Sequence, residues 1–233
     1  MKKQLIFYKG GRLRFVGHLD MMRTMQRALT RAGIPLAYSQ GFNPHPHMSF
    51  ASPLALGCTG ERDIMEIRIE KDMTDREVMD GLNEQLPEGL RILAVRTVEG
   101  KEDAIMAKVK INEYRIEFPK DLDAQGAMND LMAQETIMLT KLAKVHGRKQ
   151  PVQIDVKPLI FGIDWSDEHT MVIRCAGGSE TNLKPELLLE KIYQQMGCPD
   201  RQHEEKTSRV NMYGREEDGS LVCLTDYSGW SCQ

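Results

Sequence analysis

The chain of 233 residues has 41% hydrophobic and 28% charged residues and a formal net charge of −3, a composition typical of a globular protein with a sizeable core. No apolar run approaches the ~20 residues that a membrane span needs, and the N-terminal residues lack the apolar stretch of a signal peptide. The five cysteines are odd in number and scattered, which favours reduced thiols over a disulfide framework. We therefore expect a cytoplasmic protein of one large or two small domains, without a membrane partner.

The first hundred residues give alternating strand and helix signals. Leu19, Met22 and Leu29 at helical spacing predict one helix, and Thr74 with Glu77 three residues on is a capping box that starts another. The predicted elements are a strand Lys3–Tyr8, an extended piece Arg12–Val16 after a Gly-Gly break, a helix His18–Ala32, a short strand Pro35–Ser39, an extended piece His47–Leu56, a strand Asp63–Glu70, a helix from Thr74 to about Leu86 and a strand Arg91–Glu99.

The second half shows a similar succession of signals. Its predicted elements are strands Glu113–Phe118 and Thr136–Ala143, a helix Leu122–Gln134, an extended piece Val152–Val156, a helical turn within Pro158–Ile163, a strand His169–Ala176, a helix Pro185–Met196 and a strand Thr207–Tyr213.

Both halves follow the order β-α-β-β-α-β, which is that of the ferredoxin-like fold, where two helices cover one face of an antiparallel sheet. We therefore predict an α+β protein of two tandem ferredoxin-like units with antiparallel sheets. The units are expected at residues 1–100 and 111–214, joined by a linker Lys101–Lys110 and followed by a tail, residues 215–233.

Positive charge and aromatic rings are concentrated near the start of the chain. Residues 1–60 contain eight Lys and Arg but one acid, Asp20, so this segment is +7 and the remainder −10. Six of the fourteen aromatic residues also fall there. Cationic side chains interleaved with rings are typical of single-stranded nucleic-acid binding, where charge holds phosphates and rings stack on bases. The alternative is that the rings belong to the core and the charges pair with the acidic remainder.

Three arginines form one stripe on the first predicted helix. Arg23, Arg27 and Arg31 stand at i, i+4 and i+8, and like charges at this spacing repel by roughly a few tenths of a kcal/mol per pair. An acidic neighbour or bound phosphates should compensate them, and Arg binds phosphate with a forked geometry. We predict that the stripe binds RNA phosphates, with an ordinary solvated face as the alternative.

A stiff polar loop follows this helix, from Tyr38 to His47. The Asn-Pro and His-Pro pairs restrict the backbone before each proline, and Gly41 permits a close backbone approach. Such loops on a sheet scaffold commonly carry binding residues. We expect rings to stack on bases and polar groups to bind base edges or sugars, and the predicted contacts are Tyr38, Gln40, Phe42, Asn43 and His45. The alternative is an elaborate turn without a ligand.

Three histidines raise two further interpretations. His45 and His47 on extended backbone, together with His18, would offer zinc three ligands, but no HExxH or CxxC pair accompanies them, so we predict no metal and no cofactor. His18 with Tyr38 or His45 would suit metal-independent RNA cleavage as general acid and base, with arginines stabilising the phosphorane. The competing interpretation is that His18 caps the helix start or bonds a backbone carbonyl.

Several motifs occur in a fixed order near the start of the chain. They are Gly-His-Leu-Asp at Gly17–Asp20, Arg-x3-Arg-Ala at Arg23–Ala28, Arg-Ala-Gly at Arg31–Gly33, Tyr-Ser-Gln-Gly-Phe-Asn-Pro-His-Pro at Tyr38–Pro46 and Ser-Phe-Ala-x-Pro-Leu at Ser49–Leu54. Together they resemble the radical SAM-linked protein family, a domain of unknown function catalogued as number 2344. Weaker matches continue at Lys149–Ile160 and Gly178–Leu187.

The resemblance implies a partner, a radical SAM protein encoded separately, because this chain carries neither the iron–sulfur motif nor a cobalamin signature. The expected tandem arrangement also resembles the CRISPR repeat-processing endoribonuclease superfamily, at the level of the fold only.

These observations lead to three hypotheses. The first is an RNA-binding accessory module for tRNA or rRNA, which works with a radical SAM enzyme and has no chemistry of its own. The alternatives are a metal-independent endoribonuclease of the CRISPR repeat-processing type, and a protein–protein adaptor. The endoribonuclease would cleave RNA in EDTA and depend on His18, whereas the adaptor would tolerate charge reversal of the arginine stripe.

Overall fold

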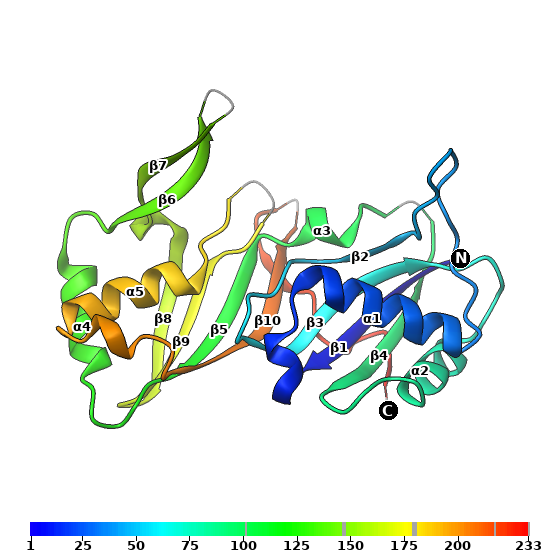
Figure 1. Ribbon diagram of the computed structural model, residues 1–233, viewed down its shortest axis with the longest axis horizontal. Helices are drawn as coiled ribbons and strands as arrows, with labels where there is room; N and C mark the ends of the chain where they lie inside the picture. The colour runs from blue at the N-terminus through cyan, green and yellow to red at the C-terminus, as the bar shows by residue number, and fades with distance from the viewer. Residues whose placement is uncertain (101, 146–147, 179–180, 217, 233) are drawn as a thin grey trace.

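Ten strands form one continuous sheet that runs through the whole molecule, and two further strands form a separate hairpin (Figure 1). The computed structural model describes residues 1–100, 102–145, 148–178, 181–216 and 218–232, with the backbone alone for 141–145. Within these ranges, none of the helices has both the length and the apolar character that a membrane crossing needs. The predicted α+β class with predominantly antiparallel pairing is confirmed.

The first half of the chain builds four of the paired strands. Its elements are β1 (Lys2–Lys9), η1 (a 3₁₀ helix, Gly11–Phe15), α1 (His18–Arg31), β2 (Met48–Phe50), β3 (Thr59–Arg68), α2 (Asp75–Asn83) and β4 (Leu90–Val98). β1 pairs antiparallel with both β3 and β4, and β2 pairs antiparallel with β3. The order across this half is therefore β4-β1-β3-β2.

The second half repeats this order with an insertion. Its elements are α3 (Ile105–Lys108), β5 (Ile111–Glu117), α4 (Ala124–Ala133), β6 (Met138–Val145), β7 (Arg148–Asp155), η2 (Lys157–Leu159), β8 (Ile160–Asp167), β9 (Thr170–Ala176), α5 (Pro185–Gln195), η3 (Pro199–Arg201), β10 (Lys206–Arg215), β11 (Leu221–Cys223) and β12 (Ser231–Cys232). Antiparallel pairing gives the order β10-β5-β9-β8. β6 and β7 pair with each other and project from the body (Figure 1).

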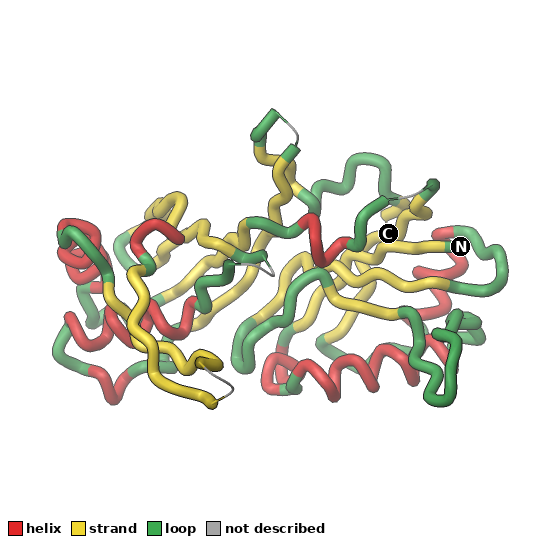
Figure 2. Tube along the Cα trace, turned by 90° about the horizontal axis from the view of Figure 1, so that it is seen from above, coloured by secondary structure: helices red, strands yellow, loops and turns green. Residues whose placement is uncertain are grey.

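Side-chain alternation on the strands separates two apolar layers. In β1, Leu5 and Phe7 pack with Met25 of α1 and Val78 of α2, while Ile6 belongs to a different buried cluster. Successive side chains of a strand point to opposite faces, so this strand is covered on both sides. In the second half α4 and α5 pack on β5 and β9 in a core of their own, and α1 and α5 lie on the same side of the sheet (Figures 1 and 2).

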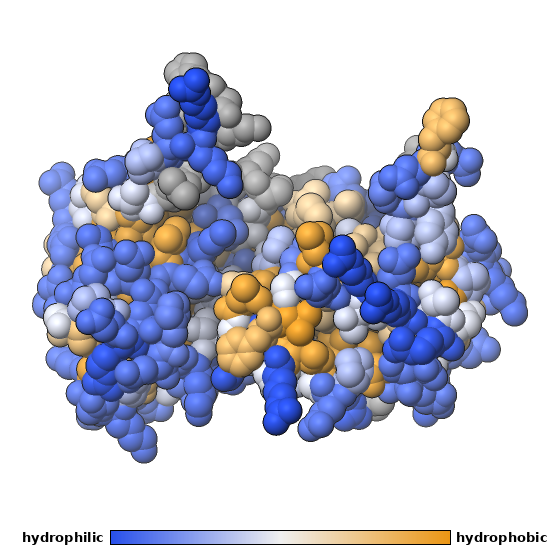
Figure 3. Space-filling model, viewed as in Figure 1, coloured by the Kyte–Doolittle hydropathy of each residue, from blue (hydrophilic) through white to orange (hydrophobic). Residues whose placement is uncertain are grey.

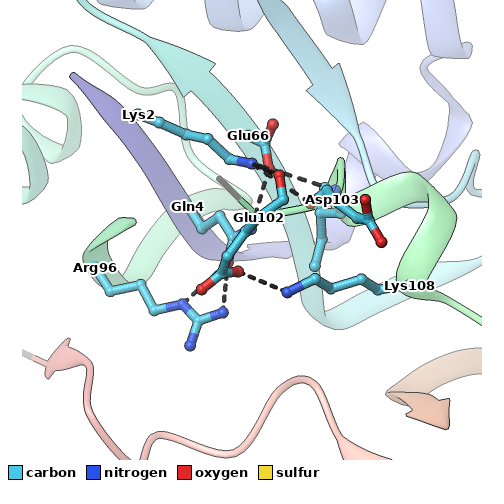
Figure 4. Close-up of polar contacts among 8 residues, drawn as sticks. Lys2, Gln4, Glu66, Arg96, Glu102, Asp103 and Lys108 are labelled. Carbon is cyan, nitrogen blue, oxygen red and sulfur yellow. Dashed lines mark hydrogen bonds and ion pairs between the residues drawn. The ribbon is translucent and has the colours of Figure 1, made fainter. Parts of the chain in front are cut away.

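The face of the first half that the helices leave uncovered is closed by α3 and its flanking residues. Ile105 is buried there in an apolar cluster with Ile6 and Ala94. A polar network links the residues around α3 to β1, β3 and β4 (Figure 4). Lys2 Nζ lies 3.1 Å from Glu66 Oε2, and Lys108 Nζ lies 2.6 Å from Glu102 Oε2. The expected linker therefore contains a helix that packs on the sheet.

The C-terminal tail completes the same face. β11 pairs with β10, and β12 then returns to the first half and pairs with β4. The Arg96 guanidinium carbon lies 4.7 Å from the centroid of the Trp230 ring, a cation–π contact that fixes the tail on β4.

A buried ion pair joins the two halves where β3 and β10 pair in parallel. Arg209 of β10 is 1% exposed, and its Nε and Nη2 donate to the two carboxylate oxygens of Asp63 at 2.9 and 2.8 Å. Its remaining donors bind the carbonyls of Ser52 and Pro53. A Cβ at Gly60 would lie 2.7 Å from Asp63 Oδ2, so glycine is required there for the pair to form.

Several sequence predictions are confirmed. α1 ends one residue before the predicted end, and α2 begins at the predicted capping box, where Thr74 N–H donates to Glu77 Oε2 at 2.7 Å and Glu77 N–H donates to Thr74 Oγ1 at 3.2 Å. The strand predicted at Asp63–Glu70 corresponds to β3.

Three predictions are wrong in part. Arg12–Val16 is a 3₁₀ helix, because Gly11 takes a φ of +56° and Leu13 N–H then donates to Gly10 O. The turn expected within Pro158–Ile163 ends at Leu159, and β8 begins at the next residue. The two expected sheets are one, since the parallel contact between β3 and β10 makes them continuous.

Asp63→Asn should lower the free energy of unfolding by about 3–5 kcal/mol, because it leaves the buried Arg209 charge without its counter-ion. Urea unfolding followed by circular dichroism measures this. Asp164→Asn, which breaks the exposed pair with Arg174, is the matched control and should have little effect. Equal effects of the two substitutions would contradict the structural role of the buried pair.

Candidate nucleic-acid interface

The three lysines among the first sixty residues make contacts within the fold and do not form an exposed basic surface. Lys2 pairs with Glu66, and Lys3 is buried with Nζ 2.7 Å from Asp75 Oδ1. Lys9 is also buried, and its Nζ donates to the Val16 carbonyl at 2.9 Å. Burial lowers the pKa of Lys9, although Asp63 nearby opposes that shift. These cations are not available to a partner.

The remaining positive charge of this segment lies on η1 and α1. We call these five side chains the arginine face: Arg12, Arg14, Arg23, Arg27 and Arg31. Figure 3 shows a row of strongly hydrophilic residues along α1, beside a hydrophobic area at the centre of the molecule. The interpretation that the charges pair with the acidic remainder therefore holds for Lys2 and Lys3, while Lys9 binds a carbonyl. The arginines differ from these lysines.

Most of the arginine face keeps its charge uncompensated. Arg23 Nη1 lies 2.9 Å from Asp20 Oδ1 in an exposed pair, and Arg31 donates to the Gln85 carbonyl at 2.7 Å, which is neutral. Arg27 is exposed and has no hydrogen-bond or ion-pair partner among the described residues. With one carboxylate for five guanidinium groups, this surface is suited to a polyanion.

The predicted binding loop is a braced projection beyond the C-terminal end of α1 (Figure 1). Tyr38 and Pro46 form a β-bridge, Ser39 N–H donates to the His45 carbonyl, and His45 N–H donates to Ser39 Oγ, both at 2.9 Å. Phe42 is fully exposed. The remaining predicted contacts are also exposed: Tyr38, Gln40, Asn43 and His45. The loop presents rings and polar groups on a backbone that its own hydrogen bonds hold.

The loop and the arginine face are separate surfaces. Within the described ranges, no hydrogen bond or ion pair joins the loop side chains to the guanidinium groups. His18, at the start of α1, makes an edge-on contact with Phe50 at 5.5 Å between centroids and lines a small crevice with Lys9 and Asp63. Among the described residues, His18 makes no contact with Tyr38 or His45. The structure therefore does not place His18 beside either residue as an acid–base pair.

The histidines also do not form a cluster. His45 and His47 are exposed, and the described residues contain no group of three or more His, Cys, Asp or Glu side chains placed to hold one metal ion. The cysteines are free, and burial raises the pKa of Cys58 to about 12. That thiol is therefore protonated at neutral pH.

A cavity of about 280 Å³ at the junction of the two halves could not be predicted from the sequence. It lies between η1, the turn before β3, the start of α5 and the residues that precede β10. Arg14 and Phe15 contribute from one half and Glu186 and His203 from the other. No local pattern links residues so far apart in the chain.

The structure is that of an α+β protein whose helix α1 carries an exposed basic surface. The family described as "Uncharacterized protein conserved in bacteria (DUF2344)" matches residues 2–185, and the chain belongs to it. This confirms the family that the sequence motifs resemble, while the radical SAM partner stays a prediction.

A search of curated proteins finds no match to the chain. Among solved structures, the chain is similar to an unknown protein from Galdieria sulphuraria, at 12% identity over 96% of this chain and 98% of that chain, with a TM-score of 0.28. A likeness at that score carries no inference about fold or activity.

Phe42→Ser should leave the free energy of unfolding unchanged within ~0.5 kcal/mol, because the ring contacts solvent rather than the core. Phe50→Ser, at a buried ring, should lower it by at least ~3 kcal/mol. Thermal or urea unfolding of the two variants measures the difference. A large loss for Phe42→Ser would show that the ring packs in solution and is not presented to a partner.

Proposed function

We propose that this protein binds RNA through the arginine face and contributes no chemistry of its own. The observation that carries the proposal is the concentration of five arginines on η1 and α1, which among the described residues form an ion pair with one carboxylate, that of Asp20. Forked guanidinium groups bind phosphate oxygens, and a stripe of them follows a phosphate backbone. The lysines of the same segment are buried or paired, so arginine is the cation that this surface offers.

The loop would add base contacts to these phosphate contacts. α1 has 14 residues, or about 21 Å of helix at ~1.5 Å per residue, and the loop projects beyond its far end. A strand lying along α1 would reach Tyr38 and Phe42, whose exposed rings suit stacking, and Gln40 and Asn43, which offer hydrogen bonds. A structured RNA such as tRNA or rRNA offers unpaired segments of this kind.

We further propose that each half is a ferredoxin-like unit and that the two share one sheet. The support is the strand order, which is β4-β1-β3-β2 in the first half and β10-β5-β9-β8 in the second. Without the inserted hairpin, both halves follow one pattern. On this proposal β6 and β7 are an insertion into the second unit. The radical SAM partner rests on the family resemblance alone, and the RNA would be presented to it.

Neutralising the stripe tests the RNA proposal. The triple variant Arg23→Gln, Arg27→Gln, Arg31→Gln should bind total cellular RNA more weakly than the unchanged protein. The slope of log affinity against log salt concentration should become less steep by about 2, because three phosphate contacts are lost and each single-strand contact contributes ~0.7 to the slope. Filter binding or fluorescence anisotropy between 50 and 200 mM salt, roughly the range over which such contacts are lost, gives both values.

The matched control removes the same charge elsewhere. Arg76, Lys120 and Lys206 are exposed and lie outside η1 and α1, so their triple change to Gln should leave the slope unaltered. If the two triple variants behave alike, the arginine face is not the binding surface. RNA cleavage in EDTA that disappears on His18→Ala would favour the endoribonuclease instead, and partner binding without RNA binding would favour the adaptor.

A further inference from the structure

The cavity between the two halves is large enough for one small planar group. Its volume of about 280 Å³ is close to the lower end of the range for small-molecule sites, which begins near ~300 Å³. It opens beside the arginine face, because Arg14 and Phe15 of η1 belong to its wall. A ligand segment bound along η1 and α1 would therefore lie next to it.

Two buried polar atoms in this wall have no partner. Arg14 Nε, a donor, and Glu186 Oε2, an acceptor, are both shielded from solvent and make no hydrogen bond within the described part of the chain. Buried polar groups are nearly always hydrogen-bonded, and an unpaired one destabilises the fold. The two residues come from different halves and line the same cavity, so a ligand with an acceptor on one edge and donors on another would satisfy both atoms once their side chains turn toward it.

The rest of the wall has an aromatic and aliphatic part, and a polar part formed by His203, Glu205 and Thr207. Phe15 is 62% exposed although it is a large ring, and the Arg14 guanidinium carbon lies 4.7 Å from its centroid. Leu56 and Leu189 add aliphatic surface. The Cys58 thiol is neutral, since burial raises its pKa to about 12. Such a wall favours a flat ring that stacks on Phe15.

The wall is also held in place on both sides. Gly57, with a φ of +82°, donates its N–H to the Arg14 carbonyl at 2.9 Å, which fixes η1 against the turn. On the other side Arg201 binds both carboxylate oxygens of Asp121, at 2.6 and 3.1 Å. His203 sits two residues later with a φ of +87°, a conformation that non-glycine residues rarely adopt. Strain of this kind recurs at binding sites.

We propose that the cavity binds a guanine base. This inference rests on the proposed RNA function and names the base that the protein would prefer. Guanine carries adjacent N1–H and N2–H donors, which a carboxylate such as Glu186 accepts together, and O6 and N7 acceptors on another edge, which suit Arg14. Adenine, cytosine and uracil each present an acceptor within the edge that would face Glu186. The guanine comes from an unpaired position of RNA or from a free nucleotide, and the test separates these sources.

The experiment compares oligo-uridine ten-mers that carry one central guanine, adenine or cytosine, together with free guanosine monophosphate, by fluorescence anisotropy and competition. The guanine oligomer should bind about tenfold more tightly than the others. Glu186→Gln should remove that preference, since an amide offers one acceptor and one donor. Glu190→Gln, one turn further along α5 and outside the cavity, makes the same charge change and should keep the preference.

Phe15→Ala is the second variant, because this side chain is 62% exposed and its removal should cost little stability. It should weaken binding of the guanine oligomer and of the free nucleotide by roughly tenfold through lost stacking. If Glu186→Gln proves unfolded by circular dichroism, Phe15→Ala decides the question, and unchanged affinity would overturn the guanine site.

The outcomes distinguish this inference from the proposed function. Salt-sensitive binding of all oligomers with equal affinity would overturn the guanine site and leave RNA binding standing. Binding of guanosine monophosphate that Glu186→Gln abolishes, with no oligomer bound, would support the guanine site with a free nucleotide as its source and overturn RNA binding. Absence of binding by every probe would overturn both.

Discussion

The buried contact between Arg209 and Asp63 sets the geometry on which the other features depend. Removing both charges from water costs several kcal/mol, and the two parallel N–H···O bonds, with carbonyl contacts to Ser52 and Pro53, offset it. These carbonyls belong to the turn that leads to Gly57 and so to η1. One ion pair thereby fixes the relative position of the two sheet halves, the turn between them and the 3₁₀ helix that carries Arg14 and Phe15.

Lysine and arginine have different tasks in the first sixty residues. The three lysines lie on β1, where the flexible stem reaches a carboxylate or carbonyl inside the fold. The five arginines lie on η1 and α1 and mostly face solvent. The +7 charge of residues 1–60 therefore overestimates the charge at their surface. The cations that remain exposed are arginine guanidinium groups, which are planar, forked and permanently protonated. That is the chemistry of phosphate recognition rather than of general electrostatic attraction.

The parts of the fold with local causes could be predicted from the sequence. Helical spacing located α1 and its arginines, and Thr74 with Glu77 located the start of α2. β8 was missed because a register shift near Gly162 interrupts its alternation. The contact of Arg209 with Ser52 spans 157 positions, and the cavity joins Arg14 to Glu186, which are still further apart. No local pattern exists for such contacts. In the sequence, Glu186 is one acid among others in the first turn of a helix. Its candidate role follows only from its position on the same cavity wall as Arg14.

The return of the tail to β4 has a consequence for the order of assembly. Ser231 and Cys232 extend a sheet edge formed by residues 90–98, and Trp230 stacks on Arg96 of that strand. During synthesis, the first half would therefore keep an open strand edge and an incompletely covered sheet face until residues 231 and 232 had been made. Unpaired strand edges invite association with other chains, so the nascent protein passes through a period in which chaperone protection matters most.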